Sequence, residues 1–452
     1  MNWMKGFTRT PHAVLMGLAL LLTADSAMAD CTYTVKGKLA VQHQLPELVT
    51  AHGTSPLKGV KVQISGKAKV LGVWGWYAVW DEVTTNSLGE FSLTQTKACY
   101  DHRYKIEVKF QSDDLEVRHE TSTSSTTKVK WYLIFEDETV DHGPGTLDVG
   151  TRTFSPTGAR DLNLQEARDH ADIWVAYQKA IEKINGYGPD RAFTSQIRVK
   201  FPHNSDVVSD TVEASYANPA TQVIYIFESH FNISTLYHEL MHVWAYQHVS
   251  GELGLAWELM ENGSTHGLVD EPWVAFHEGF AEYGSDKLQQ IIFGETPRLP
   301  YNRERLTRGI GGTPLTSLSL VQRHDMGWWS AFHIMTTANL DDYTFKTAWT
   351  GGTASTPTYI VPRDPSPILY SCNPPSLTFA QVLKVFLANS TAGYPNNLTK
   401  DEMLVSRFYD RAADVLTDLS LADSDSFLDL LNPAGTTQPL NEFCSPILTP
   451  LP

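Results

Sequence analysis

The chain has 452 residues, with 35 lysines and arginines against 51 aspartates and glutamates, so its formal net charge at pH 7 is −16. This acidic balance argues against nucleic acid or an anionic membrane as a partner. The length predicts two or three domains, each large enough to bury its own hydrophobic core.

Residues 1–29 have the three parts of a secretory signal peptide. Lys5 and Arg9 form a basic start, residues 13–22 form an apolar run, and residues 27–29 read Ala-Met-Ala, an A-x-A cleavage site. The apolar run is too short for a stable membrane-spanning helix. We therefore expect an exported protein, periplasmic or extracellular, that has no membrane span.

Export implies an oxidising compartment, in which an even number of cysteines indicates disulfides. Four cysteines allow three pairings. Their places within the two domains proposed below favour Cys31–Cys99 and Cys372–Cys444. No C-x₂-C spacing occurs, so the cysteines do not indicate a structural zinc site.

Residues 30–155 are predicted to be all-β. Hydrophobic residues alternate with polar ones in four stretches, the pattern of half-buried strands, and turn sequences at residues 56–59 and 86–89 separate the strands. The alternating sets are Tyr33-Val35-Leu39-Val41, Val60-Val62-Ile64, Tyr104-Ile106-Val108-Phe110 and Val129-Trp131-Leu133-Phe135.

Three strings in this region, PLKGVKVQISG at 56–66, TTNSLGEFSL at 84–93 and TLDVGTRTF at 146–154, resemble the transthyretin-like or carboxypeptidase-regulatory β-sandwich. The resemblance implies that residues 30–155 form such a sandwich. Trp74, Trp76, Tyr77 and Trp80 gather in one stretch of it. Packing within the strands explains this cluster better than a sugar- or peptide-binding patch.

From residue 156 the hydrophobic period becomes helical. Asn163 and Glu166 have the spacing of a capping box, and Gly186 ends the predicted helix. Strands are predicted at 196–201 and 222–227, and Ser234 or Thr235 is the expected N-cap of the next helix. One face of the first helix carries Ala167, Ala171, Trp174, Ile181 and Ile184.

Residues 238–242 spell His-Glu-Leu-Met-His. On an α-helix, positions i and i+4 lie on one face, so His238 and His242 can converge on one metal ion. Imidazole suits Zn²⁺, and a catalytic zinc site has three protein ligands and one open position for water. Glu239 is placed to take a proton from that water. Two such histidines also fit a buried, hydrogen-bonded core pair, so a third ligand is needed.

Residues 277–283, His-Glu-Gly-Phe-Ala-Glu-Tyr, contain a candidate for this third ligand. HExxH followed by EGxAEY resembles the gluzincins, zinc peptidases with a thermolysin-like catalytic core. The resemblance implies that Glu278 is the third zinc ligand and that Glu282 braces a ligand histidine. The spacing departs from the family, because 35 residues separate His242 from Glu278 and the compact gluzincin spacing is shorter.

The same resemblance implies an α+β metallopeptidase domain over residues 156–452. In it, residues 222–227 would be the edge strand that holds a peptide by backbone hydrogen bonds. A helical C-terminal subdomain would follow, and its apolar stripe is Phe379, Val382, Leu383, Phe386 and Leu387, with Thr399 and Glu402 capping another helix.

His248 is a competing third ligand. His238 to His248 almost fits the metzincin string HExxHxxGxxH, but Ala245 stands where that family has the glycine that turns the chain back. Alanine is a strong helix former. We therefore expect His248 to continue the helix and to lie too far along it to reach the metal.

The sequence thus predicts an exported zinc metallopeptidase that hydrolyses proteins or peptides, with Glu239 as general base. The absence of a motif for binding a substrate terminus favours an endopeptidase. Tyr301 and His333 are candidates for stabilising the oxyanion. The alternative is a surface adhesin or binding protein with an inactive peptidase fold, against which the intact Glu239 argues.

Overall fold

The structure is a computed structural model. It describes residues 29–119, 129–155, 164–203, 215–218, 221–248, 272–294, 332, 349–353, 356–359, 369–372, 378–384 and 444–447. The chain divides into two compact units, the first formed by residues 1–42, 54–111 and 130–168 and the second by 43–53, 112–129 and 169–452. Two segments that precede residue 155 therefore group with the second unit, so no single boundary at that residue separates the units.

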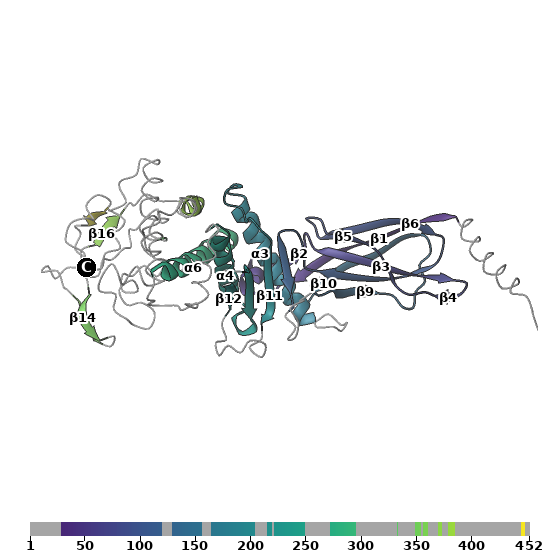
Figure 1. Ribbon diagram of the computed structural model, residues 1–452, viewed down its shortest axis with the longest axis horizontal. Coiled ribbons are helices and arrows are strands. Elements are labelled where there is room, and N and C mark those ends of the chain that lie inside the picture. The colour runs from purple at the N-terminus through teal and green to yellow at the C-terminus, as the bar shows by residue number, and fades with distance from the viewer. Residues whose placement is uncertain are drawn as a thin grey trace, which may run out of the picture. The chain divides into compact units, whose positions relative to one another are not determined.

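The first unit contains two β-sheets, whose strands run side by side along it (Figure 1). In one sheet the central strand is β1 (Asp30–Gln42), which pairs with β10 (Gly145–Phe154), β2 (Thr54–Pro56) and β6 (Glu90–Ala98). In the other sheet β3 (Lys61–Val70) pairs with β4 (Val73–Trp74), β5 (Ala78–Thr84) and β7 (His102–Lys109), and β7 pairs with β9 (Tyr132–Glu136).

The core of this unit follows the predicted alternation. The ring of Tyr33 on β1 contacts the rings of Trp80 and His102 on the other sheet, with centroids 5.8 and 4.6 Å apart. The prediction for the last strand is wrong in phase, because β9 buries Tyr132 and leaves Trp131 and Leu133 only half-buried. The predicted residues that are fully buried include Val35, Leu39, Val41, Val60, Val62, Ile64, Ile106, Val108 and Phe110.

The predicted disulfide between Cys31 and Cys99 is present, and it joins the start of β1 to the residue after β6. The packing interpretation of the aromatic stretch is confirmed for Trp80, which lies against Tyr33 and Tyr104. It is wrong for Trp76, whose side chain is 95% exposed.

The second unit contains a four-stranded mixed sheet in the order β12-β13-β11-β8. Strand β11 (Ile197–His203) is parallel to β13 (Val223–Phe227) and to β8 (Leu115–Arg118), which explains why residues 112–129 belong to this unit. Both predicted strands are thus confirmed. The edge position expected for residues 222–227 is wrong, because β12 (Tyr216–Asn218) pairs antiparallel with the outer side of β13.

Helix α3 (Leu164–Asn185) ends directly before Gly186, as predicted, and all five residues of its predicted apolar face are buried. Asn163 of the predicted capping box lies outside the described residues. Asp172 of α3 binds the segment that leads into α2 (Pro46–His52). Its Oδ1 lies 2.6 Å from Nδ1 of His43, and its Oδ2 accepts the backbone N–H of Gln44 at 3.0 Å. These buried contacts place residues 43–53 with the second unit.

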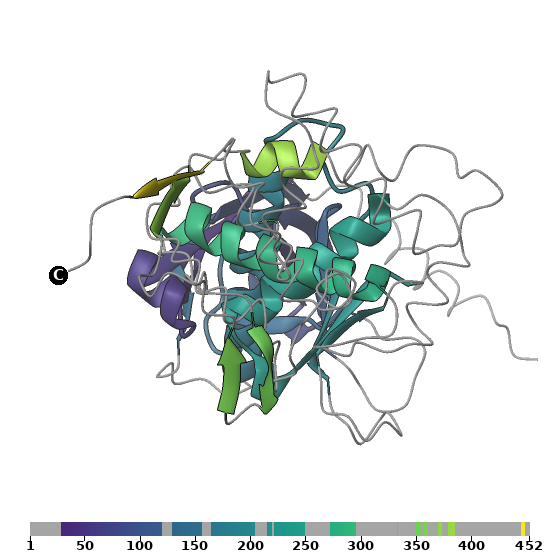
Figure 2. The ribbon, with the colours of Figure 1, turned by 90° about the vertical axis from the view of Figure 1, so that its left-hand side faces the viewer.

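The 3₁₀ turn η2 (Glu228–His230) leads into helix α4 (Ile233–His248), and α6 (Pro272–Phe293) packs against α4 (Figure 2). The prediction of Ser234 or Thr235 as N-cap is wrong. Asn232 caps α4, because its Oδ1 accepts the backbone N–H of Thr235 at 2.8 Å.

The later part of the chain is described in short pieces. Strand β14 (Trp349–Thr353) pairs with β15 (Thr356–Tyr359), and β16 (Leu369–Cys372) pairs with β17 (Cys444–Ile447), with Cys372 opposite Cys444. The region expected to be helical therefore contains strands as well. Residues 379–384 are helical and bury Phe379, Val382 and Leu383, whereas Phe386, Leu387, Thr399 and Glu402 lie outside the described residues.

At the coarse level the chain agrees with the expectation of a β-rich first part followed by a part that mixes helices and a sheet. Residues 1–28, which carry most of the predicted signal peptide, lie outside the described residues. Within the described part, none of the helices combines the length and the apolar character that crossing a bilayer requires.

Candidate metal centre

Helices α4 and α6 bring His238, His242 and Glu278 together in the second unit. The Nε2 atoms of the two histidines are 3.0 Å apart, and each lies 3.2 Å from Oε2 of Glu278. All three side chains are buried. Among the described residues, these three form the group of histidine, cysteine and acidic side chains that can hold a metal ion, with ligand atoms within 4.8 Å of one another.

Two features of the sequence set the distance and register between the helices. Gly284 lets α6 approach α4 closely, because a Cβ at this position would lie 2.6 Å from Cγ of Met241. Ser285 Oγ donates a hydrogen bond to the carbonyl oxygen of Ser234 at 2.8 Å, which fixes α6 against the first turn of α4. This contact aligns residue 278 with the turn of α4 that carries both histidines.

Glu282 lies on the other side of the His238 ring. Its Oε1 is 3.5 Å from Nδ1 of His238, whose Nε2 faces Glu278. Glu278 and Glu282 are four residues apart on α6, so they lie on one face of that helix and reach both nitrogens of one imidazole. A carboxylate on the outer nitrogen fixes the tautomer of a ligand histidine and makes it more basic.

The electrostatics of the site favour positive charge. Burial alone would lower the pKa of His238, but the hydrogen bond with Glu278 and the charges of Glu282, Glu239 and Glu278 outweigh it and raise that pKa to about 10. Burial alone would raise the pKa of Glu278, and the neighbouring His242 and His238 outweigh it, so that this pKa lies well below its usual value. A buried carboxylate that stays ionised beside two imidazoles is the environment that a cation stabilises.

The three residues fit a zinc ion. Zinc binds imidazole nitrogen and carboxylate oxygen at about 2.0–2.2 Å in tetrahedral geometry, which keeps ligand atoms about 3.3–3.6 Å apart. The observed separations of 3.0 and 3.2 Å are close to these values. A site with three protein ligands leaves a fourth position for water, as catalytic zinc sites do.

His248 stays on the helix, as expected. It is the last residue of α4, its ring packs against Trp244 with centroids 4.6 Å apart, and burial lowers its pKa. Ala245 is buried within the same continuous helix. The chain therefore does not turn back at residue 245, and His248 is not part of the group formed by His238, His242 and Glu278.

Glu239, the predicted base, is buried on α4 beside His238. Two tyrosines that the sequence reasoning missed lie in its electrostatic surroundings. Burial raises the pKa of Tyr177 on α3 and of Tyr246 on α4 well above the ordinary value of 10. The charge of Glu239 adds to this effect at Tyr177, and the charges of Glu278 and Glu239 add to it at Tyr246. The Tyr246 ring is stacked on His242, 5.8 Å between centroids. Its spacing of four residues from His242 was a signal that could have identified it.

Tyr301 and His333, the candidates for stabilising an oxyanion, lie outside the described residues. No protein-family model matches this chain, and no curated protein has a matching sequence.

Proposed function

We propose that this protein is an exported zinc metallopeptidase that hydrolyses internal peptide bonds. One observation carries the proposal: His238, His242 and Glu278 converge to within 3.2 Å of one another while Glu282 lies at the outer nitrogen of His238. Two ligand histidines, a ligand glutamate and a bracing carboxylate form the set expected from the resemblance of HExxH and EGxAEY to gluzincins.

A Zn²⁺ ion held by His238, His242 and Glu278 would supply a Lewis acid for the peptide carbonyl and would make a water molecule more acidic. Glu239 would accept a proton from the attacking water and pass it to the leaving amine. Glu239 precedes the ligand His242 by three positions on the same helix, so it lies next to the metal position without serving as a ligand. Glu282 holds the ring of His238 in the tautomer that binds metal.

The edge of the mixed sheet is the proposed place for the substrate chain. Strand β12 occupies this edge with residues Tyr216–Asn218, and its inner side is paired to β13. An extended peptide can add to an exposed sheet edge through backbone hydrogen bonds. We therefore transfer the peptide-binding role from residues 222–227 to β12.

The proposal also assigns the two parts of the chain. The paired sheets of the first unit are taken as a carboxypeptidase-regulatory-like β-sandwich, and the second unit as a thermolysin-like peptidase domain. Residues 1–29 are taken as the signal peptide that exports the protein to the periplasm or the exterior.

The direct test is to measure metal content and cleavage of casein or a peptide library, with and without a chelator. The expected result is about one zinc per chain, internal cleavage that the chelator abolishes, and recovery on adding zinc. A zinc-loaded protein that leaves the library intact would instead indicate a binding protein with an inactive peptidase fold.

A further inference from the structure

Tyr246 stands about one turn beyond His242 on α4, and its ring lies over that residue. Side chains of an α-helix lean toward the N-terminus of the helix, so Tyr246 covers the turn that carries His242. The two rings are nearly parallel, with an interplanar angle of 11° and centroids 5.8 Å apart. The Tyr246 ring also lies 6.2 Å from the ring of His277 on α6, the residue before Glu278. Tyr246 is therefore part of the wall of the candidate metal centre.

The hydroxyl of Tyr246 lies near two carboxylates of the site, because the charges of Glu278 and Glu239 both act on it. Glu278 belongs to the group that can hold a metal ion, and Glu239 is the proposed base, about two turns before Tyr246 on α4. Among the described residues, none is hydrogen-bonded to this hydroxyl. A phenol O–H in this position is a donor that a bound substrate can use.

Tyr246 differs from the other tyrosine near Glu239 in its exposure. Tyr177 of α3 is 0% exposed, whereas Tyr246 is half-buried. A substrate can therefore touch the side chain of Tyr246 but cannot touch that of Tyr177. The partial exposure and the contact with His242 together place Tyr246 at the accessible side of the site.

Hydrolysis of a peptide bond benefits from a donor at the attacked carbonyl oxygen. This oxygen becomes an oxyanion when water adds to the carbonyl carbon, and donors that are already in place stabilise the new charge most effectively. A tyrosine keeps its proton at neutral pH and can serve as such a donor. Among the described residues, Tyr246 combines an O–H group, partial exposure, contact with His242 and proximity to Glu239.

We propose that Tyr246 is a catalytic residue whose hydroxyl donates a hydrogen bond to the oxyanion that forms at the peptide carbonyl. The inference rests on the proposed peptidase function and adds a role for this residue. The hydroxyl keeps its proton throughout, so Glu239 still passes the proton of the water to the leaving amine. The stacking on His242 holds the ring and thereby fixes the direction of the donor.

The first test is Tyr246→Phe, which removes the hydroxyl and keeps the ring that stacks on His242. The variant should bind about one zinc per chain, and its kcat for a library peptide should fall by about 100–1000-fold, the loss typical of one removed oxyanion donor. KM should change little, because the bound substrate does not yet carry the oxyanion. Loss of zinc with a normal kcat in the loaded protein would instead assign the hydroxyl to holding Glu278, and would overturn the proposal.

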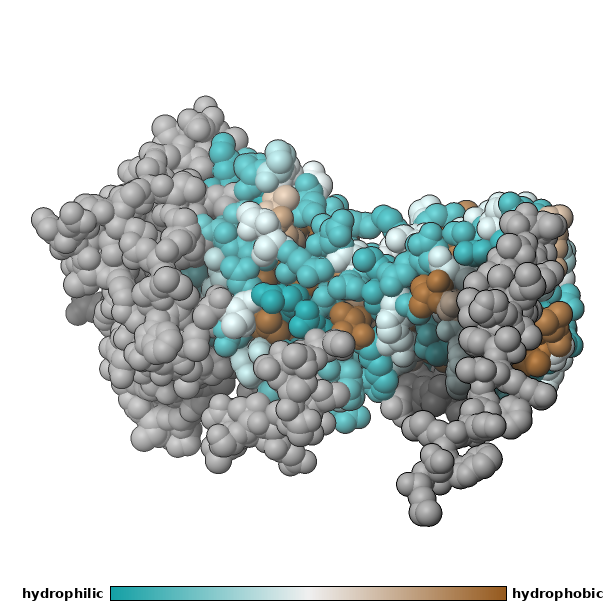
Figure 3. All heavy atoms as spheres, turned by 45° about the vertical axis from the view of Figure 1, so that its right-hand side comes forward, coloured by the Kyte–Doolittle hydropathy of each residue, from teal (hydrophilic) through white to brown (hydrophobic). Residues whose placement is uncertain are grey.

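Trp76→Ser is the control for substrate binding elsewhere on the protein. Figure 3 shows brown hydrophobic patches on the described surface, and Trp76 of the first unit is 95% exposed. A peptide held at such a patch makes the same contact before and during the reaction, so losing that contact raises KM and leaves kcat unchanged. Trp76→Ser should therefore have the kcat of the wild type, in contrast to Tyr246→Phe.

A second test does not depend on hydrolysis. Acetohydroxamate binds a metal ion through two oxygens, one of them a carbonyl oxygen, and it fits any peptide specificity because it has no side chains. Its binding to the Co²⁺-substituted protein is followed by the visible absorption of the metal. Tyr246→Phe should bind this probe at least about tenfold more weakly than the wild type, because a hydrogen bond to a charged ligand is lost. Equal affinities overturn the proposal.

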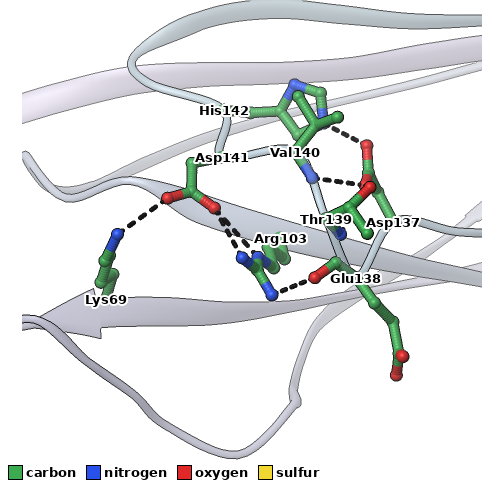
Figure 4. Close-up of polar contacts among 8 residues, drawn as sticks. All are labelled: Lys69, Arg103, Asp137, Glu138, Thr139, Val140, Asp141 and His142. Atoms are coloured by element: carbon green, nitrogen blue, oxygen red, sulfur yellow. Dashed lines mark hydrogen bonds and ion pairs between the residues drawn. The ribbon is translucent and has the colours of Figure 1, made fainter.

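Two other tyrosines provide matched controls. Tyr177→Phe removes a hydroxyl that also lies near Glu239 but is buried. Tyr104→Phe removes one in the first unit, where the ring lies 5.7 Å from that of His142, a member of the polar cluster drawn in Figure 4. Both variants should have the kcat and the hydroxamate affinity of the wild type. Losses in Tyr177→Phe as large as those in Tyr246→Phe would overturn the proposal.

The two tests separate this inference from the peptidase function. A wild type that cleaves peptides and a Tyr246→Phe variant with the same kcat would remove the role of Tyr246 and leave the peptidase function intact. A wild type that binds Co²⁺ and acetohydroxamate but cleaves nothing would remove the peptidase function. The ratio of the hydroxamate affinities would then still decide whether the Tyr246 hydroxyl donates to an oxygen at the metal position.

Discussion

Glu282 Oε1 lies 3.5 Å from Nδ1 of His238, while Nε2 of the same ring lies 3.2 Å from Oε2 of Glu278. One imidazole is thus held between two carboxylates that stand four residues apart on α6. A histidine that is only part of the core needs no more than one acceptor for each ring N–H. Here Nε2 of His238 lies near both Glu278 and Nε2 of His242, which is 3.0 Å away, and this arrangement favours a cation beside Nε2.

The ranking of ligand variants tests this arrangement. Glu278→Ala should lose zinc and activity together, because it removes one of three buried ligand atoms. His248→Ala should leave both nearly unchanged, since this ring packs on Trp244 at the end of α4. Glu282→Ala should lie between them, with about a 10–100-fold loss of metal affinity or activity. Zinc content after gel filtration and the rate of peptide cleavage measure both effects. The reverse ranking of Glu278 and His248 would assign the protein to the metzincins.

Glu239→Gln separates metal binding from catalysis. The variant should retain about one zinc per chain, because residue 239 is not a ligand, and should lose hydrolysis by several orders of magnitude, because glutamine cannot accept the proton. Zinc analysis and single-turnover cleavage of one peptide provide the two measurements. If the zinc-loaded variant cleaved at a substantial rate, another residue would have to act as the base.

The close contact between α4 and α6 predicts that the effect of Gly284→Ala on stability depends on Met241. In the wild type the new Cβ would lie 2.6 Å from Cγ of Met241, a clash that should destabilise the protein by about 1–3 kcal/mol. The higher helix propensity of alanine should offset about 1 kcal/mol of this cost. In a Met241→Ala background the clash is absent, so the same substitution should stabilise. Urea unfolding of the four proteins in this cycle gives the coupling. Additive effects would show that the glycine is not needed for helix approach.

The cysteines predict two bridges, each within one part of the chain. Non-reducing peptide mapping should find Cys31 joined to Cys99, as in the structure, and Cys372 joined to Cys444, whose residues face each other across β16 and β17. Replacing Cys31 and Cys99 by serine should cost about 2–4 kcal/mol of stability. A peptide joining Cys31 to Cys372 or Cys444 would contradict both pairings.

The first unit should lose stability in acid. Burial alone would raise the pKa of Asp137, but the backbone N–H groups of Val140 and Thr139 and the side chain of His142 outweigh it and lower that pKa below 3.8. Because the folded pKa is below the unfolded one, this stabilisation is complete above the ordinary pKa and is lost as pH falls through the lowered value. Urea unfolding should show the decline below about pH 4, and Asp137→Asn, which carries no titrating charge, should show a shallower one.

Local periodicity was sufficient to predict α3, β1, β3, β7, β11 and β13 and to place His238 and His242 on one helix face. Glu278 and Glu282 were predicted instead from the resemblance of EGxAEY to the gluzincins. The apolar positions of α3, the alternation in β1, β3 and β7, and the spacing of His238 and His242 depend only on residues a few positions apart. Helix and strand geometry place such residues on one face wherever the segment packs. The predicted alternation of β9 is wrong: Tyr132 is buried, and not Trp131 and Leu133. The pairing of β7 with β9 shifts in register between Ile106 and Glu107.

Only the tertiary structure decided which distant groups meet. Glu278 stands 36 positions from His242 and reaches it because Gly284 and Ser285 set the fit of α6 on α4. Strand β12 pairs with β13, because the backbone N–H and C=O groups of a buried strand need hydrogen-bond partners. Asp172 of α3 binds His43 and Gln44, because a buried carboxylate also needs partners. The exposure of Trp76 is of the same kind. Trp76 and Trp80 stand four residues apart in one aromatic stretch, yet the Trp80 ring packs against Tyr33 and Tyr104 while Trp76 is 95% exposed.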